Sequence, residues 1–302
     1  MSHGASTGEI VKSLAVNVVI ACCKGVAAVL SGSGAMLAET IHSFADCSNQ
    51  LLLLRGVKQA HKPADKQHPF GYGRSVYFYS FIVALLLFFG GGVFSIEEGI
   101  EKIHHPEPVE SIGVALVILL FSIALEGWSL WGNIKEMNKR RGDVPLLRYL
   151  RETKDSDLIV VAGENSAAVL GLVFALAALV LAKETGDGRW DGICSLAIGI
   201  VLVGVATFLA REVKSLLVGE SADKRLLATL DQLADVDPNV DKVLNVITLQ
   251  QGPGEIVVAM KLQMRAGLSG EQMVDAINAF ERELKTKEPD VRWSFIEPDN
   301  AD

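Results

Sequence analysis

Six long apolar segments dominate this 302-residue chain and restrict what it can fold into. Each is close to or longer than the ~20 residues that an α-helix needs to cross the hydrocarbon of a bilayer. A soluble helical protein would need amphipathic helices, but stretches such as LAVNVVIACCKGVAAVL and SIGVALVILLFSIAL offer almost no polar face. The sequence therefore predicts an α-helical membrane protein whose six transmembrane helices lie at residues 10–34, 36–58, 76–103, 110–136, 163–184 and 190–217.

Basic residues are unevenly distributed among the loops, and this orients the predicted spans. The loop between spans two and three holds Lys62 and Lys66, and the loop between spans four and five holds six basic residues from Lys139 to Lys154. By contrast, the segment SGSG after the first span carries no charge, and the two other odd-numbered loops have few basic residues. The positive-inside rule then places the even loops and both termini in the cytoplasm.

The composition changes after the sixth span. Residues 221–302 contain nine Lys or Arg and fifteen Asp or Glu, and so account for −6 of the chain's net charge of −8. This acidic module argues against nucleic acid as a partner. We therefore expect three parts: an N-terminal cytoplasmic tail at 1–9, a six-span transmembrane domain at 10–219 and a cytoplasmic C-terminal domain at 220–302.

The hydrophobic pattern of the C-terminal module predicts the order helix, strand, strand, helix, strand. The leucines of DKRLLATLDQLA share one helical face, and EIVVAMKLQM alternates with period two. Ser269 followed by Gln272 is a capping-box pattern at the start of the second helix. Val291, Trp293 and Phe295 belong to a closing strand with alternating pattern. The predicted fold is a small α+β, ferredoxin-like domain with both helices on one face of the sheet.

The second apolar segment, AETIHSFADCSNQLLLL, contains ionisable residues where lipid-facing residues are expected. On a helix, Glu39, His42 and Asp46 fall on one narrow stripe. An ionised aspartate at mid-span costs at least ~2.5 kcal/mol, so such groups usually face a bundle interior and mark ion pathways. A His and an Asp four residues apart reach a single divalent ion, and zinc accepts this mixture of nitrogen and oxygen. A His–Asp hydrogen bond that only packs two helices together is the alternative.

Two ligands do not hold zinc well, so other spans must contribute. Glu164 at the start of the fifth span is the best third ligand, with a simple N-terminal helix charge as the alternative reading. Weaker candidates, some of them alternatively helix-end charges, are Asn17, Glu39, Glu97, Glu98, Glu126 and Asn165.

Three segments resemble those of a known family, the cation diffusion facilitators: SGSGAMLAETIHSFAD, KPADKQHPFGYGR and WDGICSLAIGIVLVG. The resemblance covers nearly the whole chain. It implies a homodimeric membrane antiporter that exports zinc or a related divalent ion in exchange for protons, with metallochaperone-like tails that dimerise. No cofactor is implied, and the expected partners are a second copy, the metal ion and membrane lipid. Within the family, ENSAAVLG is similar to the branch that contains zinc transporter nine.

The resemblance also implies roles for individual residues. His42 and Asp46 match the family's metal pair on the second span, and the second pair, on the fifth span, matches Glu164 and Ala168. Alanine is no ligand, so the fourth ligand is missing from its usual place. An asparagine, Glu39 or a water would then complete the metal's coordination.

Two further metal sites of the family are altered. A loop site of Asp, His and His matches Asp65, His68 and Tyr72, and the tyrosine would weaken or remove this site. Asp65 alternatively only caps the turn. All six histidines lie at or before position 105, so the C-terminal domain has none. We expect this domain to dimerise without the family's usual binuclear metal site.

The ligand set leaves alternatives to zinc transport open. One imidazole with carboxylate and amide oxygens also suits Mn²⁺ or Fe²⁺. A metal sensor or scaffold that moves no ion is a second alternative, and the replacement at Ala168 favours it. The sequence contains neither an HExxH metalloprotease motif nor a GxxxxGK phosphate loop, so we expect no enzyme.

The segment MSHGASTGEIVKSL bears on localisation. It lacks the basic start and cleavage site of a secretory signal and the arginine content of a transit peptide. This favours a bacterial inner membrane over an organelle.

Overall fold

The part of the chain that the computed structural model describes comprises residues 7–31, 34–106, 112–154 and 156–300. These residues form two compact units. The first consists of residues 76–214 and the helices that precede residue 60. The second consists of residues 215–300 together with the segment 60–75, which connects the second helix to the third. The second unit thus combines two stretches that are far apart in the sequence.

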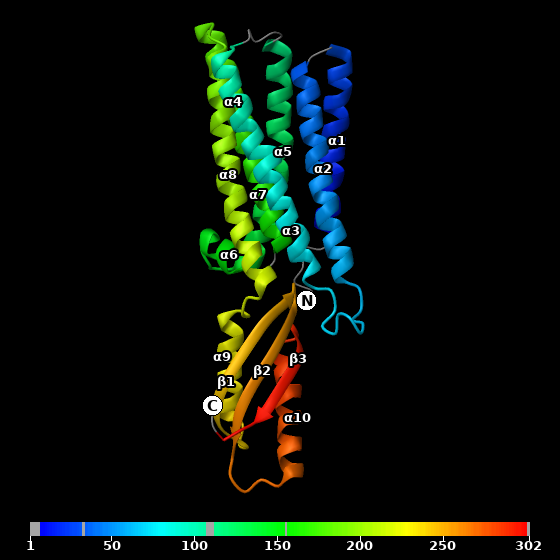
Figure 1. Cartoon of the computed structure of the whole chain (residues 1–302), viewed down its shortest axis with the longest axis vertical. Coiled ribbons are helices and arrows are strands. Elements are labelled where there is room, and N and C mark those ends of the chain that lie inside the picture. The colour runs from blue at the N-terminus through cyan, green and yellow to red at the C-terminus, as the bar shows by residue number, and fades with distance from the viewer. Residues whose placement is uncertain (1–6, 32–33, 107–111, 155, 301–302) are drawn as a thin grey trace. The chain divides into compact units, whose positions relative to one another are not determined.

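The first unit is a bundle of long helices that run along roughly one direction (Figure 1). Segments α3, η1 and α4 follow one another without a break, and the middle of this continuous helix is π-helical. The short α6 follows the basic end of α5. The bounds are α1 Thr7–Ser31, α2 Gly34–Ala60, α3 Ser75–Leu86, η1 Leu87–Val93, α4 Phe94–His104, α5 Ile112–Arg141, α6 Leu146–Glu152, α7 Ser156–Thr185 and α8 Arg189–Val218.

Three helices, at Ser75–His104, Leu158–Thr185 and Arg189–Val218, are long and apolar enough to cross a membrane. Only the described residues enter this assessment, and α1, α2 and α5 each contain side chains outside them. All six predicted spans are helical in the structure, within several residues of the predicted bounds. The helical architecture is therefore confirmed, whereas the number of six membrane crossings stays a prediction.

Glycines bring the continuous α3–η1–α4 helix into backbone contact with α8. A Cβ at Gly99 would lie 2.8 Å from the carbonyl oxygen of Gly192, and a Cβ at Gly199 would lie 2.8 Å from that of Gly92. The two glycines of each helix are seven residues apart, so the contacts recur every two turns along antiparallel helices. Small residues at such contacts allow close helix packing in lipid. Gly92 is the last of three consecutive glycines, and a Cβ at Gly90, the first of them, would have no neighbour within 4 Å.

The C-terminal domain has the predicted element order. Helix α9 (Lys224–Val236) precedes strands β1 (Val240–Gly252) and β2 (Glu255–Met264), and α10 (Gly270–Lys287) connects β2 to β3 (Val291–Pro298). The sheet order is β1-β2-β3, with β1 and β2 antiparallel and β2 and β3 parallel. Figure 1 shows the long β1–β2 hairpin. The capping box is confirmed: Ser269 Oγ accepts from the Gln272 backbone N–H, and the Gln272 side chain accepts from that of Ser269.

One apolar core holds this domain together. Leu226, Leu230 and Leu233 of α9 and Phe280 and Leu284 of α10 pack against alternate residues of β2. Both helices therefore cover the same face of the sheet, as predicted. The residues that β2 contributes to this core are Ile256, Val258, Met260 and Leu262.

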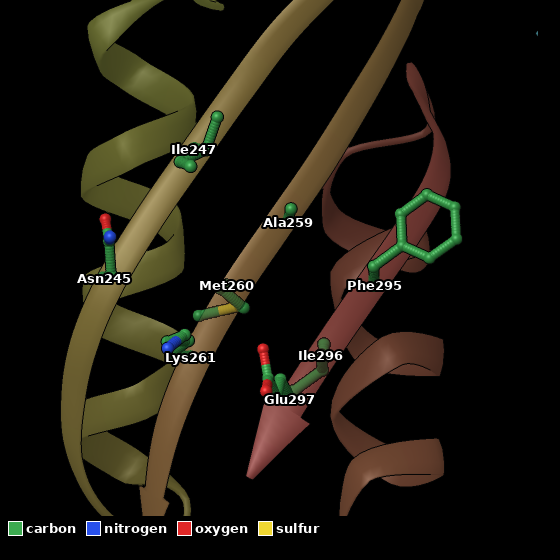
Figure 2. A pocket seen from close by; sticks show the side chains of 8 residues that line it. All are labelled: Asn245, Ile247, Ala259, Met260, Lys261, Phe295, Ile296 and Glu297. Atoms are coloured by element: carbon green, nitrogen blue, oxygen red, sulfur yellow. The ribbon is translucent and has the colours of Figure 1, made fainter. Parts of the chain in front are cut away.

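The predicted alternation of β3 is wrong in one respect. Val291 lies in the core, but Trp293 and Phe295 lie on the opposite face, and Ile296 packs against the core instead (Phe295 and Ile296 are drawn in Figure 2). The cause is an irregularity in the β2–β3 register: Ile256 pairs with Val291, whereas the next residue of β2 pairs with Trp293. One extra residue in a strand reverses the face of every side chain after it.

Candidate metal site

The middle of helix α2 buries polar side chains and exposes apolar ones. Asn49 and Gln50 are 7% and 1% exposed, whereas Phe44 and Leu51 are 52% and 53% exposed. In lipid, an exposed apolar side chain lies in an apolar solvent, and polar groups turn toward the bundle or an aqueous cavity. This pattern agrees with a membrane helix whose polar stripe, including Asp46, faces other helices.

Helices α5 and α7 pack along each other and present a second group of polar residues. Asn165 of α7 is 3% exposed, and its Nδ2 donates a 3.0 Å hydrogen bond to Ser129 Oγ of α5. Glu126 lies one turn before Ser129 and is also buried, and Glu164 directly precedes Asn165. The i, i+3 spacing on α5 therefore brings a carboxylate to the same side as the hydroxyl.

Polar residues of α2 and α5 act on Glu164 of α7. The side-chain amide of Asn49 donates a hydrogen bond to the Glu164 carboxylate, and Asp46 and Glu126 are both near enough to act on it electrostatically. One oxygen of this carboxylate, Oε1, is buried and has no hydrogen-bond partner among the described groups. Like charges repel at low dielectric, so the influence of Asp46 and Glu126 opposes the charged form of the Glu164 carboxyl.

The structure tests only part of the predicted ligand set. The side chains of Glu39 and His42 lie outside the described residues. Among the side chains that are described, no three His, Cys, Asp or Glu residues are grouped closely enough to hold a metal ion. Asp46 acts electrostatically on the Glu164 carboxylate, and the binding of a metal by these residues stays a prediction. Asn17 is buried on α1, and its Oδ1 has no hydrogen-bond partner within the described part.

Two residues of this cluster were missed in the sequence, and one was underrated. Asn49 follows Asp46 by three residues and Ser129 follows Glu126 by three, so helical spacing alone places each beside a carboxylate. Neither is ionisable, which is why neither stood out. Glu126 is only a weak candidate in the sequence, because one sequence does not show that it acts on Glu164 of another helix.

The other acidic candidates lie elsewhere. Glu98 of α4 contacts Lys102 Nζ at 2.9 Å, and the same ammonium contacts Asp191 of α8 at 2.9 Å. The pair of Lys102 with Asp191 joins the two helices that the glycines already bring together. Glu98 is thus occupied in an ion pair within α4.

The Asp65 carboxylate organises the turn between α2 and α3. Its Oδ1 accepts from the backbone N–H groups of Gln67 and His68, at 2.9 and 2.8 Å, and its Oδ2 accepts from the Tyr72 hydroxyl at 2.7 Å. The Tyr72 hydrogen bond, followed by the backbone ones, lowers the pKa of Asp65 to about 2. The His68 and Tyr72 rings stack with centroids 4.2 Å apart. Asp65 therefore caps the turn, and His68 Nδ1 also lies 3.4 Å from its Oδ1, so the loop metal site stays a prediction.

A family model for the cation efflux transmembrane domain matches residues 10–218. The chain belongs to the cation efflux family. This confirms the resemblance to the cation diffusion facilitators, and it also confirms that the chain is a transport-family protein and no enzyme. The match to a transmembrane domain and the three apolar helices together make it a multi-pass membrane protein.

Several curated relatives align over most of the chain. The proton-coupled zinc antiporter SLC30A9, mitochondrial, of Xenopus laevis is 30% identical over 93% of this chain and 58% of its own length. The human protein of the same name is 28% identical over 91% of this chain and 55% of its own length. Metal tolerance protein C4 of Arabidopsis thaliana is 30% identical over 74% of this chain and 50% of its own length. The predicted likeness to the branch of zinc transporter nine is confirmed.

The chain spans between 50% and 58% of the length of these relatives. The names of the two antiporters include the word mitochondrial. The bacterial inner membrane predicted from the sequence therefore gains no support from them.

Proposed function

We propose that this chain exports a divalent cation, zinc in the first place, across a membrane in exchange for protons. The observation that carries the proposal is the Glu164 carboxylate of α7: its Oε1 is buried without a hydrogen-bond partner among the described groups, Asn49 donates a hydrogen bond to it, and Asp46 and Glu126 act on it electrostatically. Membership of the cation efflux family and the names of the aligned antiporters support it. His42 is one turn from Asp46 on α2 and completes the proposed site.

The proposed mechanism is alternating access. The ion enters from the cytoplasm, binds His42, Asp46 and Glu164 between α2 and α7, and leaves on the other side after the helices have rocked. Metal ligands must be deprotonated, so a lower pH on the exit side competes with the ion for these groups. Histidine suits this role because its ordinary pKa lies near neutral pH. Proton entry thereby drives metal exit.

We further propose that Glu126 supplies the ligand that Ala168 lacks. Glu126 is buried on α5 and acts on Glu164 electrostatically. It therefore lies on a different helix from Ala168, which is in α7. Replacing Glu126 by Gln should weaken zinc binding by about 10- to 100-fold, as loss of a supporting group at a metal site does. Ala168→Asp in the Glu126→Gln chain should restore part of that affinity. No change in affinity in Glu126→Gln would exclude Glu126 as a ligand.

Transport itself is tested with the full chain in proteoliposomes. Zinc flux should follow an imposed pH gradient and disappear in His42→Ala, Asp46→Ala and Glu164→Ala. Glu97→Gln is the matched control, because Glu97 is an exposed carboxylate outside the cluster. Unchanged flux in the three site variants would discard the site. Zinc binding with no flux in the parent chain would instead favour the sensor or scaffold alternative.

The choice of ion and the assembly are proposals of the same kind. Competition of zinc with Mn²⁺ and Fe²⁺ in this assay separates the three ions, since ligand chemistry alone does not. We propose a homodimer whose C-terminal domains, residues 220–302, pair without bound metal. Mass photometry of the purified chain with and without a chelator measures this, and a chelator-sensitive dimer would contradict it.

A further inference from the structure

The segment 60–75 between α2 and α3 is packed against the C-terminal domain. Phe70 meets two aromatic residues of β3 edge-on, with ring centroids 5.4 Å from Trp293 and 6.4 Å from Phe295. Both residues lie on the sheet face that α9 and α10 leave uncovered, because the irregularity in β3 turns them away from the core. The bulged strand thus presents an aromatic surface, and Phe70 is bound there.

A second contact joins this segment to the β1–β2 hairpin. A Cβ at Gly73 would lie 2.5 Å from Glu255 Oε2 and 2.8 Å from the Gln251 carbonyl oxygen, and a Cβ at Gly252 would lie 2.8 Å from Gly73 Cα. Two glycine backbones are therefore in direct contact, and no other residue fits at either position without a shift. Glu255 is held in place by Arg292 of β3, whose Nη1 donates to Oε1 at 2.6 Å.

The segment is also ordered internally, as a docking element must be. Asp65 caps its turn through two backbone N–H groups and the Tyr72 hydroxyl. Lys62 Nζ lies 5.8 Å from the centroid of the Tyr72 ring, at the distance of a cation–π contact. Side chain, backbone and ring contacts together hold the residues between Lys62 and Tyr72 in one shape.

We propose that the segment 60–75 couples the C-terminal domain to the transport helices. Helix α2 ends at Ala60 and α3 begins at Ser75, so both helices are covalently joined to a segment that belongs to the C-terminal unit. A movement of that domain therefore reaches α2, which carries Asp46, without any metal in the loop. The flux readout of this inference rests on the proposed transport function.

The coupling is tested by breaking the contact and by locking it. Phe70→Ala and Trp293→Ala should each raise the hydrogen-exchange rate of residues 60–75 in the full chain by about 2- to 10-fold, because each removes one aromatic pair. They should slow zinc flux several-fold while the zinc concentration for half-maximal flux stays unchanged. The double variant should be no slower than the slower single one, because both remove one contact. Val274→Ala, an exposed apolar residue of α10, is the control.

The lock uses Phe70→Cys with Trp293→Cys in a chain whose four native cysteines are replaced by serine, joined by a short reducible cross-linker. Flux should persist in the locked chain, because segment and domain already move as one unit. Loss of flux on locking, or normal flux in Phe70→Ala, would overturn the coupling. Failure to cross-link would overturn the docking itself. An inactive parent chain with normal exchange and cross-linking would refute the proposed transport but not the docked segment.

Discussion

The helical unit and the C-terminal domain differ in the side chains that they expose: large apolar side chains are exposed at many positions of the helical unit and at few positions of the C-terminal domain. In the C-terminal domain, Leu230, Leu262 and Leu284 are fully buried, as expected for a domain surrounded by water. In the helical unit, Gln50 and Asn165 are just as inaccessible, while Phe44 and many other large apolar residues are exposed. Water drives apolar groups inward in one unit, and lipid removes that driving force in the other.

This difference between the units indicates which buried residues have a functional role. A buried leucine in the C-terminal domain is explained by stability alone. A buried carboxylate in a membrane helix costs stability and therefore asks for another explanation, such as an ion. The comparison predicts that replacing a buried leucine of the C-terminal domain harms folding, whereas replacing a carboxylate of the membrane helices harms mainly transport.

The largest effect on stability is expected for Leu230→Ala. Leu230 is 0% exposed at the centre of the α9 contact with the sheet, and removing its side chain should cost about 2–5 kcal/mol of unfolding free energy. Hydrogen exchange of the β2 amides in the full chain measures this. Leu227→Ala on the same helix is only partly buried and should cost less. Equal costs would contradict the assigned core face.

Gly199→Ala should destabilise the helical unit by about 1–3 kcal/mol. The new Cβ would lie 2.7 Å from the Ile96 backbone nitrogen and 2.8 Å from the Gly92 carbonyl, so the two helices must separate. Thermal unfolding in detergent detects the loss. Gly204→Ala on the same helix is the control, because nothing lies within 4 Å of its Cβ position. A normal melting temperature in Gly199→Ala would argue against the glycine contact.

Glu164→Gln should separate stability from transport. Gln keeps a group that can bond to Asn49 and removes a charge from beside Asp46 and Glu126. The unfolding free energy should therefore stay the same or rise by about 1 kcal/mol, while zinc flux falls at least about tenfold. Parallel melting and flux measurements decide this. A less stable protein with normal flux would show that Glu164 serves stability and not transport, which would contradict the prediction.

The smallest effect is expected at Asp65, and it depends on pH. Because the pKa of this exposed carboxyl is lowered to about 2, its contribution to the turn is present above its ordinary pKa near 3.8 and is lost as the pH falls toward 2. Amide exchange of Gln67 and His68, corrected for intrinsic rates, should show protection at pH 5 that declines below pH 3. Asp65→Ala should show none at either pH. Protection that is independent of the carboxylate would contradict the cap.

Features set by local sequence could be predicted, whereas features set by contacts between distant segments could not. Period two in residues 256–264 located the core face of β2, and Ser269 with Gln272 located the start of α10, because both signals are local. The face of Trp293 was missed, since the extra residue in β3 depends on pairing with β2. The docking of Phe70 on that face was missed for the same reason.

In the helical unit, the sequence singled out Asp46 and Glu164 because an acid in an apolar span is costly, and the structure shows Asp46 acting electrostatically on Glu164. Asn49 and Ser129 carry no charge, so nothing in the sequence separated them from ordinary polar residues of a bundle. Which of several acids faces Glu164 depends on how α5 is rotated against α7. That rotation is set by packing between helices.

Anomalous diffraction at the zinc absorption edge, from the full chain loaded with zinc, tests the central claim most directly. We predict one strong peak inside the helical unit within coordination distance of Asp46 and Glu164 oxygens, with His42 and Glu126 as the further ligands. The peak should vanish in Asp46→Ala. A zinc ion bound elsewhere in the helical unit, with these carboxylates turned away from it in a chain that transports zinc, would contradict the account.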